Sequence, residues 1–434
     1  MGGRSDRAGL ALMPLQRFTA EQWASRPPDR GDLGGTAEQR EAVRAICRRV
    51  ADEGDAALRD YALRFDGWAP PPGEGWALGR DDLERALAAL PAAQRSALEL
   101  AARRIRAFHE AEAYGDVRGP EGLELRVRPV RRAGLYVPGG RVPYPSTVLM
   151  TAIPARVAGV AEVLLATPPA AGGGVAAPIL AAAALAGVDA VYRMGGAQAI
   201  AAFAHGTATV PRVDVVAGPG NVYVTLAKRE VFGAVGVDAV AGPTEIMVVA
   251  DASAPAHYVA ADLASQLEHD PMAWAVLVTE SLALADAVEE AFTDLAARLD
   301  RSEVVQAARC CIVLAASPEA AIGVANDFGP EHLEIVAADP EPLLALVENA
   351  GAVFVGPHAP VSLGDYVIGP NHTLPTSGSA RFSSPLGVYT FLKRTSVARV
   401  GRVGLGELAE AATTLARMEG LTAHAHAIEV RLSD

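Results

Sequence analysis

The sequence predicts an α/β protein with two Rossmann-like parallel-sheet domains, a helical N-terminal lobe and a C-terminal helix–strand tail. Short runs rich in Val, Ile and Leu alternate with helical segments in two successive series, a pattern typical of parallel sheets covered on both faces. At 434 residues the chain is long enough for two to four compact lobes. We therefore expect an N-terminal helical arm over 1–122, Rossmann-like domains over 123–241 and 242–380, and a tail over 381–434.

The N-terminal segment has the pattern of paired helices. Residues 36–66 carry amphipathic helical spacing, with Thr36 as the expected N-cap and acidic residues in the first turn. Gly54 is expected to divide this stretch into two helices. Helical spacing resumes over 81–113 after a proline- and glycine-rich break, and Pro91 marks a junction within it.

Two series of strands and helices follow. The first has the strand-like runs LELRVRPV, GLYVP, AEVLLATP, DAVYRM and VDVVAG, and the helical runs PSTVLMTAIPARVAG, APILAAAALAG, GAQAIAAFAHG and NVYVTLAKREVFG. The second has the strands EIMVVA, WAVLVT, CIVLAA, LEIVAA and AVFVG, with helices beginning near Pro255, Ser281, Ser317 and Asp339. The tail ends in a helix, GELAEAATTLARMEG, and an expected strand, AHAIEVRL. A terminal helix and strand beyond both sheets are suited to docking on a second subunit.

Composition restricts the class of function. Half of the residues are hydrophobic and 21% are charged, which is typical of a globular enzyme. A net charge of −13 with no basic run argues against binding to nucleic acid or to an anionic membrane surface. The first residues lack a sustained apolar stretch, so we expect neither a signal peptide nor a membrane span, and a cytoplasmic location.

The cysteines give no sign of covalent or metal chemistry. Cys47, Cys310 and Cys311 are the three cysteines of the chain, and no CxxC spacing is present. Cys310 and Cys311 lie in an apolar run that reads as a buried strand, where free thiols act as small apolar side chains. We expect all three to be structural.

Metal-type and acid–base residues gather in five short segments of the second half. They are Gln266 and His269 in SQLEHDP, Glu331 and His332 in GPEHLE, Asp365 in LGDY, His372 in GPNHTLPT, and Glu419 and His424 in EGLTAH. Such side chains are costly to bury unless they pair with each other or with a metal. Convergence of these segments would create a metal site beside a separate proton-transfer pair.

The spacing around Gln266 suggests metal ligands. Gln266 and His269 are three residues apart, which places both on one face of a helix near its end. Together with Asp365 and His424 they would form a mixed nitrogen and oxygen set suited to Zn²⁺ or Mn²⁺. Without further context, QxxH is most often a surface pair, and Asp365 is equally consistent with a turn.

Glu331 and His332 are candidates for proton transfer. A histidine with its ordinary pKa near neutrality accepts a proton from an alcohol, and a nearby carboxylate orients it or activates water. Adjacent residues on a strand point to opposite faces, so a twist or bulge is needed for both to face one ligand. Alone, the dipeptide is more often not catalytic.

Three glycine-rich segments occupy positions suited to a nucleotide. VPGGRVPYPST, RMGGAQAI and AGPGN each follow a strand and open a helix, where a helix N-terminus can meet phosphate. None matches GxGxxG, so spacing alone leaves nucleotide binding open.

The motifs taken together resemble one family. GLYVPGG, PSTVLM, RMGGAQAIAAFAHGT, AGPGN, AGPTEI, SQLEHDP, GPEHLE, GDYVIGPNHTLPT, RFSSPLGVYTFLKRTS and EGLTAHAHAI occur in this order, and the chain closely resembles the histidinol dehydrogenases from about residue 38 onward. The resemblance implies oxidation of L-histidinol to L-histidine through L-histidinaldehyde, with two NAD⁺ and one zinc ion per subunit, in the final steps of histidine biosynthesis. It also implies an intertwined homodimer whose C-terminal segment completes the partner's site.

The resemblance further implies roles for individual residues. The zinc ligands would be Gln266, His269, Asp365 and His424, and the catalytic pair Glu331 and His332. Substrate contacts would come from Thr244, Gln266, His269, Glu331, Asp365, His372, Glu419 and His424. NAD contacts would come from Tyr136, Gln198 and Asn221.

Three departures from the family pattern are visible. Thr244 stands where the family usually has Ser, Leu267 where Ala is usual, and Pro385 where Gly is common. The hydroxyl of Thr244 is retained, but its extra methyl group is expected to crowd the substrate. None of the departures removes a ligand or a base.

Three other functions remain to be weighed. A related zinc- and NAD-dependent dehydrogenase of another small polar diol, such as a sulfonated one, would differ only in substrate. A zinc hydrolase using Glu331 to activate water would need no NAD and would leave the glycine-rich loops unexplained. A non-catalytic binding protein would not need an acid–base pair beside a metal set.

Overall fold

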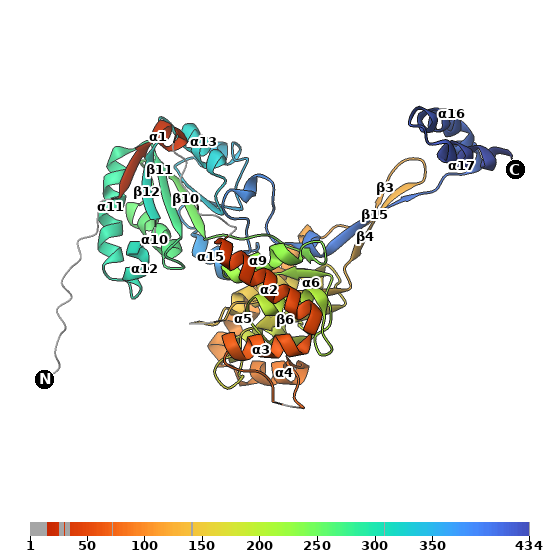
Figure 1. Cartoon of the computed structure of the whole chain (residues 1–434). Helices are drawn as coiled ribbons and strands as arrows, with labels where there is room; N and C mark the ends of the chain where they lie inside the picture. The colour runs from red at the N-terminus through yellow and green to blue at the C-terminus, as the bar shows by residue number, and fades with distance from the viewer. Residues whose placement is uncertain are drawn as a thin grey trace. The chain divides into compact units, whose positions relative to one another are not determined.

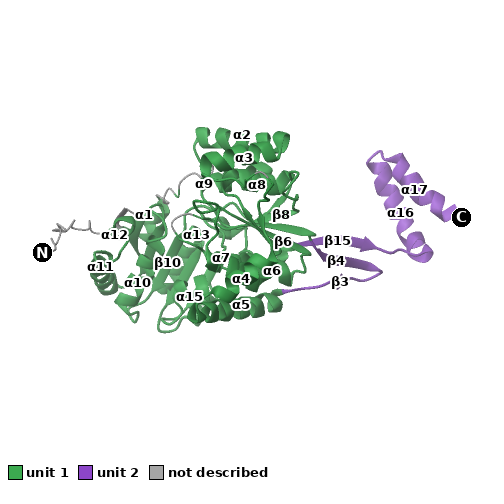
Figure 2. Ribbon diagram, turned by 90° about the horizontal axis from the view of Figure 1, so that it is seen from below, with its two compact units in different colours: residues 1–112, 130–391 green, residues 113–129, 392–434 purple. Residues whose placement is uncertain are grey.

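The computed structural model describes residues 15–25, 30, 35–71, 73–139, 142–307 and 309–433. Figure 1 shows the whole chain, and Figure 2 shows its division into two compact units. The first unit comprises residues 1–112 and 130–391, and the second comprises 113–129 and 392–434. The first unit holds two six-stranded sheets and the second a three-stranded sheet.

The first sheet carries the first predicted series of strands. Its strands are β2 (Ala77–Leu78), β5 (Arg132–Tyr136), β6 (Glu162–Thr167), β7 (Ala190–Arg193), β8 (Val215–Ala217) and β9 (Gly236–Val237). Their order is β2-β7-β6-β5-β8-β9, and all pairs are parallel except β2 with β7. The predicted strands GLYVP, AEVLLATP, DAVYRM and VDVVAG are confirmed as β5 to β8.

Helices cover both faces of the first sheet. They are α2 (Ala37–Glu53), α3 (Asp55–Phe65), α4 (Arg80–Ala89), α5 (Ala92–Glu112), α6 (Pro145–Val157), α7 (Ala177–Ala186), α8 (Gly196–His205) and α9 (Val222–Val231). β5 alternates between two cores: Tyr136 lies in the core with α2, α3, α8 and α9, and Leu135 in the core with α4 to α7. The N-terminal helices α2 to α5 are therefore layers of the first domain.

Local sequence signals set the ends of these helices. Thr36 caps α2 in a capping box with Gln39, whose side chain accepts from the Thr36 amide. Gly54, with φ of +58°, separates α2 from α3, and Pro91 lies between α4 and α5. These three boundaries agree with the sequence prediction.

The second sheet carries the second series. Its strands are β1 (Gln16–Thr19), β10 (Glu245–Ala250), β11 (Trp274–Thr279), β12 (Arg309–Leu314), β13 (His332–Val336) and β14 (Ala352–Val355). The order is β1-β12-β11-β10-β13-β14, with every pair parallel. All five predicted strands are confirmed. β1 was not expected, because QRFT has no apolar alternation and its pairing with β12 joins residues far apart in sequence.

Helices also cover both faces of the second sheet (Figure 1). They are α1 (Ala20–Ser25), α10 (Ala256–Leu267), α11 (Leu282–Ala296), α12 (Ser302–Ala307) and α13 (Pro318–Phe328), with the short α14 (Glu341–Leu344) and α15 (Val361–Tyr366) after β13 and β14. In β10, Ile246 faces the core with α10 and α11, and Met247 faces the core with α1 and α13. Two short 3₁₀ turns, Ser379–Arg381 and Val388–Phe391, close the unit.

The second unit corrects two expectations. It contains β3 (Val117–Arg118), β4 (Leu123–Pro129), β15 (Leu392–Ala398), α16 (Arg402–Met418) and α17 (Thr422–Ser433). LELRVRPV, expected in the first parallel sheet, is β4 and pairs antiparallel with β15 and β3. AHAIEVRL, expected as a strand, lies in α17. Its apolar and polar residues alternate as in a strand, but Ala, Glu, Arg and Leu favour a helix. Helix α17 also packs on α16, and Ala425 is buried.

The cysteines behave as buried side chains. All three are free, and burial raises the pKa of the Cys47 and Cys311 thiols to about 12. Both groups therefore stay protonated near neutral pH, which fits a structural role. Among the described residues, none of the helices combines the length and the apolar character that crossing a bilayer requires.

Candidate active site

A cavity of about 270 Å³ in the first unit brings together most of the predicted site. Seven predicted residues line it: Thr244, Gln266, His269, Glu331, His332, Asp365 and His372. Further lining comes from Pro138 after β5, and from Pro219 and Gly220 after β8. The cavity therefore joins the carboxyl ends of the first sheet's strands to the amino ends of β10 and β13.

The backbone before β13 allows both members of the Glu–His pair to reach the cavity. His332 is the first residue of β13, whereas Glu331 lies in a bend just before it. The alternation of side chains along a strand therefore does not apply to Glu331. Gly351 makes room for this bend, because a Cβ there would lie 2.5 Å from the Glu331 carbonyl oxygen.

The Glu331 carboxyl group is buried and held by two donors. Its Oε2 accepts from Thr244 Oγ1 at 2.5 Å and from the Glu245 amide at 2.9 Å. Burial raises the pKa of Glu331 to about 8, against the lowering effect of these two hydrogen bonds. A cation bound nearby would lower this pKa again, because positive charge favours the carboxylate.

His332 is held in the tautomer that a general base needs. Its Nδ1 lies 3.0 Å from the carbonyl oxygen of Glu245, which can only accept, so Nδ1 carries the proton. Nε2 is then the unprotonated nitrogen of the neutral ring. Burial lowers the pKa of His332, which keeps the ring neutral near pH 7. The arrangement can accept a proton at Nε2.

Gln266 is oriented by the same network. Its Nε2 donates to Thr244 Oγ1, which leaves the carbonyl oxygen Oε1 for another ligand. Gln266 is buried in the last turn of α10, but His269 lies in the turn beyond the helix end. The expectation that both sit on one helix is therefore wrong for His269, although both line the cavity.

Asp365 and His372 are the remaining predicted residues of the lining. Asp365 lies on α15, and its carbonyl oxygen accepts from His372 Nδ1 at 2.8 Å. His372 therefore also has Nε2 as its unprotonated nitrogen. Burial lowers the pKa of His372, with further lowering from the neighbouring His332 and His269.

The first unit supplies donors of the types that zinc accepts, but too few to complete a zinc site. Gln266, His269 and Asp365 offer an amide oxygen, an imidazole and a carboxylate, a mixed set that zinc accepts. Within the part of the chain that the structure describes, no group of three His, Cys, Asp or Glu residues is arranged to hold a metal ion. A further ligand is needed to complete the set.

The two C-terminal candidates belong to the second unit. Glu419 ends α16, and His424 lies in the first turn of α17. Neither is among the lining of the 270 Å³ cavity. Their roles stay a prediction.

The three predicted NAD contacts lie at the carboxyl ends of the first sheet. Tyr136 ends β5, and its hydroxyl oxygen accepts from the Gly196 amide at 3.0 Å; burial raises its pKa to about 12. Gln198 Nε2 donates to Asp66 Oδ2 at 3.3 Å, and Asn221 caps α9 by accepting from the amides of the first turn. None of the three lines the cavity, but Pro138, near Tyr136, and Gly220, next to Asn221, do.

The strand order marks the place where a nucleotide would bind. From β5 the chain continues to β6 and β7 on one side of β5, and it then crosses to β8 and β9 on the other side. The order in which strands are added therefore switches between β5 and β8. In open parallel sheets ligands bind outside the carboxyl ends of the strands at this switch point. Tyr136 and Asn221 flank it. Gly140 and Arg141, in the glycine-rich segment after β5, lie outside the described residues.

Glu245 is a functional residue that the sequence reasoning did not select. Its amide holds Glu331 and its carbonyl holds His332. A signal was present: Glu245 is the one charged residue at the start of the otherwise apolar strand EIMVVA.

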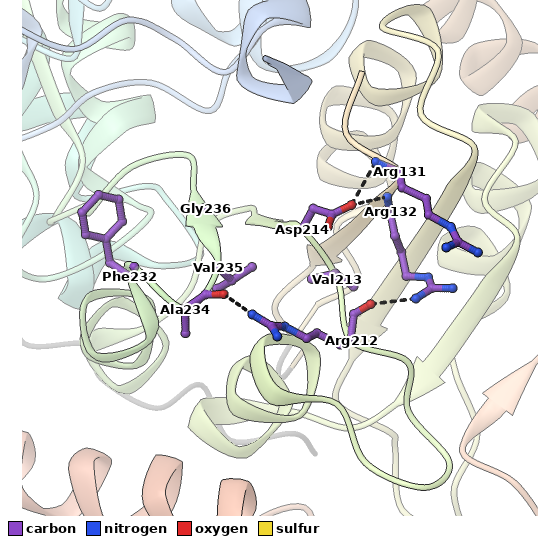
Figure 3. Close-up of a pocket in the computed structure, with 10 residues that line it drawn as sticks. Arg131, Arg132, Arg212, Val213, Asp214, Phe232, Ala234, Val235 and Gly236 are labelled. Carbon is purple, nitrogen blue, oxygen red and sulfur yellow. Dashed lines mark hydrogen bonds between the residues drawn. The ribbon is translucent and has the colours of Figure 1, made fainter. Parts of the chain in front are cut away.

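A second cavity of about 630 Å³ lies at the amino ends of β5 and β8 (Figure 3). Arg132 Nη1 donates to the Arg212 carbonyl at 2.8 Å, and Arg212 Nη2 donates to the Ala234 carbonyl at 2.6 Å. Asp214 accepts from the backbone amides of Arg131 and Arg132, each at 2.9 Å. These bonds hold the wall together, and no predicted site residue lines this cavity.

Known proteins resemble this chain over almost its whole length. The sequence profile of the family described as histidinol dehydrogenase matches residues 33–432. The histidinol dehydrogenase of Parasynechococcus marenigrum is 48% identical over 408 residues, covering 92% of this chain and 93% of the relative. That of Pseudomonas aeruginosa is 47% identical over 396 residues, covering 90% of each chain.

The chain belongs to the histidinol dehydrogenase family. A crystal structure of histidinol dehydrogenase from Elizabethkingia anophelis matches with a TM-score of 0.89 at 32% identity, covering 96% of this chain and 98% of that one. Membership confirms the family and the α/β fold predicted from the sequence. It makes the chain an enzyme, an NAD-dependent oxidoreductase of histidine biosynthesis.

Proposed function

We propose that this enzyme oxidises L-histidinol to L-histidine through L-histidinaldehyde in the cytoplasm, using two NAD⁺ and a bound zinc ion. The observation that carries the proposal is the single cavity in which His332 leaves Nε2 unprotonated beside Glu331, Gln266, His269 and Asp365. Such a cavity offers a base for the alcohol, a carboxyl group for the hydration step, and metal-type donors for an imidazole–amine substrate.

Zinc would be held by Gln266 Oε1, His269, Asp365 and His424. The first unit offers an incomplete set, so His424 is the natural completing ligand, supplied by a second copy of the chain. The second unit supports a homodimer with shared sites, because α16 exposes large apolar side chains at Val403, Leu408, Leu415 and Met418. Exposed apolar groups of this size favour burial against a partner.

NAD would bind at the switch point between β5 and β8, near Tyr136, Gln198 and Asn221. The N-termini of α8 and α9 follow the carboxyl ends of β7 and β8, a position that favours a nucleotide phosphate without a GxGxxG motif. When bound, zinc would hold the imidazole and amine of the substrate, and NAD would accept the hydride in each oxidation.

The protein's own groups move the protons. His332 Nε2 accepts the hydroxyl proton as the alcohol is oxidised, while the Glu245 carbonyl stabilises the imidazolium through Nδ1–H. Glu331 then takes a proton from the water that adds to the aldehyde, and the His332 imidazolium gives its proton to the carbonyl oxygen, which forms the hydrate and returns His332 to the neutral ring. The hydrate loses its hydroxyl proton to His332 in the second oxidation. Thr244, His372 and Glu419 would contact the substrate.

A related dehydrogenase acting on another small polar diol is the second candidate. Thr244 favours it, because the extra methyl group is bonded to the same Cβ as a hydroxyl that already contacts both Glu331 and Gln266. Membership in an oxidoreductase family leaves nothing to favour a zinc hydrolase or a non-catalytic binding protein.

Titration of the purified enzyme with limiting L-histidinol and excess NAD⁺ tests the proposal. We expect two NADH per L-histidinol, since the alcohol loses four electrons. One NADH per substrate would contradict the second oxidation. No NADH with L-histidinol, but turnover of another diol in a substrate panel, would favour the second candidate.

A further inference from the structure

We infer that Lys228 and Asp238 form a buried clamp that positions the Gly218–Asn221 turn for the dinucleotide cofactor. The inference rests on the proposed NAD site, and it names two positioning residues that do not themselves touch the cofactor. Both side chains are only 3% exposed, so they are buried in the protein and not presented to solvent.

The clamp holds both backbone polar groups of one residue, Gly218. Lys228 Nζ donates to the Gly218 carbonyl oxygen at 3.0 Å, and the Gly218 amide donates to Asp238 Oδ2 at 2.8 Å. The Lys228 ammonium lies 2.5 Å from Asp238 Oδ1, an ionic contact rather than an aligned hydrogen bond. Gly218 is thus fixed from two sides by a closed ring of three residues.

The held residue cannot be other than glycine without moving the turn. Gly218 has φ of +119°, a region that other residues rarely adopt. A Cβ there would lie 2.1 Å from the Tyr136 carbonyl oxygen, at the end of β5. The turn after β8 therefore lies directly against the end of β5, at the switch point where the nucleotide is proposed to bind.

The turn has direct access to the candidate active site. Pro219 and Gly220 line the 270 Å³ cavity, and Asn221 caps α9. Lys228 lies on α9, and Asp238 follows β9, at the start of the segment that leads to Thr244. Thr225, also on α9, donates to the Ala241 carbonyl at 3.2 Å on that segment. The clamp therefore connects the turn that is proposed to bind the cofactor with segment 238–244, which ends at Thr244 in the 270 Å³ cavity.

Stability alone is a poor reason for this pair. Moving two charges out of water carries a desolvation penalty, and replacing a buried ion pair by apolar groups is often neutral for stability. What an apolar replacement cannot reproduce is the hydrogen bond to the Gly218 carbonyl. Orientation of the two peptide units that flank Gly218 is the property that depends on the charged groups.

Three variants separate positioning from stability: Lys228→Met, Asp238→Asn, and the double variant. Each single variant leaves a buried group without its partner, so we expect lower stability in both. The double variant leaves no unpaired charge and should recover thermal stability. Its NADH dissociation constant and its KM for NAD⁺ should stay about ten-fold or more above wild type, because methionine cannot hold the turn.

Two readouts besides turnover apply to the double variant. NADH binding is followed by fluorescence titration without substrate, and hydrogen–deuterium exchange reports protection of peptide 217–224 in the free enzyme. We expect weaker NADH binding and faster exchange of this peptide. Arg156→Met is the control, since Arg156 pairs with Asp189 just before β7, on the other side of the same sheet from β8 and β9; it should leave NADH affinity unchanged.

The outcomes are distinct. Wild-type enzyme that binds NADH, with a double variant that binds it equally well, would overturn the clamp and leave the proposed function standing. Wild-type enzyme that binds no NADH would overturn both. If the double variant stays unstable, the exchange rate of peptide 217–224 is compared with the rates of neighbouring peptides. A faster rate confined to peptide 217–224 would support the clamp, and an equal increase in all peptides would contradict it.

Discussion

Glu245 holds both members of the acid–base pair through its backbone. Its amide donates to Glu331 and its carbonyl accepts from His332, because β10 and β13 pair in parallel with Ile246 opposite His332. Backbone groups of a central strand cannot move independently of the sheet. The positions of the His332 ring and the Glu331 carboxyl group relative to each other are therefore fixed.

At His332, replacement by Asn removes the proton acceptor. We expect His332→Asn to slow both oxidations by about 10²–10⁴-fold, the usual contribution of a general base, while zinc content stays normal. Single-turnover NADH formation from L-histidinol and from L-histidinaldehyde measures the two steps, and metal analysis measures zinc. The exposed His257 provides a control in His257→Asn. Wild-type rates in the His332 variant would remove His332 from the mechanism.

At Glu331, replacement by Gln keeps a hydrogen-bond acceptor for the Glu245 amide but removes the base. We expect Glu331→Gln to slow oxidation of supplied L-histidinaldehyde by about 10²-fold or more, since water is no longer activated. The measurement is the rate of NADH formation from the aldehyde. Unchanged aldehyde oxidation would show that the water-activating role is wrong.

Among the secondary-structure elements, α10, β13 and α15 carry Gln266, His332 and Asp365, and a buried carboxyl pair joins them. Glu334 on β13 accepts from the Val361 amide at the start of α15 at 2.8 Å, and it pairs with Asp262 on α10. Glu334 Oε2 is buried and accepts no hydrogen bond from the described residues, so it fits a protonated oxygen that donates to Asp262. Burial raises the pKa of Asp262 to about 6 and that of Glu334 well above the ordinary value.

The pair predicts a pH dependence of stability. A carboxyl group whose pKa is raised by folding stabilises the folded state below its unfolded pKa, and this contribution is lost as pH rises through the folded pKa. Wild-type stability should therefore fall as pH rises from about 5 through the Asp262 value of about 6 and beyond. Glu334→Gln keeps an acceptor for Val361 and a donor for Asp262 without titrating.

We expect Glu334→Gln to flatten this profile and to be more stable than wild type at about pH 8, by about 1 kcal/mol or more. Urea unfolding across the pH range measures the difference. Glu348→Gln, at an exposed carboxyl group, serves as the control. A stability difference between wild type and Glu334→Gln that does not change with pH in this range would contradict the shared proton.

For the whole molecule, the prediction concerns subunits. If His424 is supplied by a second copy, a mixture of His332→Asn and His424→Ala subunits forms heterodimers with one intact site. Random exchange should restore about one quarter of wild-type activity, since half of the dimers are mixed and each has one working site of two. Metal analysis of His424→Ala alone should show reduced zinc.

A matched mixture checks this result. His332→Asn mixed with Glu331→Gln should recover nothing, because both residues belong to the first unit and every site keeps one defect. Absence of recovery in the first mixture, after exchange has been verified by mass spectrometry, would indicate a site made within one chain.

Local signals predicted much of the fold. Thr36, Gly54 and Pro91 mark helix boundaries because caps, left-handed glycines and prolines act over a few residues. The strands β5 to β8 and β10 to β14 were predictable because runs rich in Val, Ile and Leu are also recognised over a few residues. β1, the antiparallel pairing of β4, and α17 were not, because their states depend on partners distant in sequence or on packing.

The sequence by itself determined the alternation of apolar strands and helices and the chemical types available to the site, since both follow from residue identity and short-range spacing. Only the tertiary structure decided that Gln266, Asp365 and His332 share one cavity, and which nitrogen of His332 is free. Glu245 and His332 are 87 residues apart, and their hydrogen bond exists because two parallel strands adopt one register. Register is a property of the assembled sheet, so no local pattern encodes it.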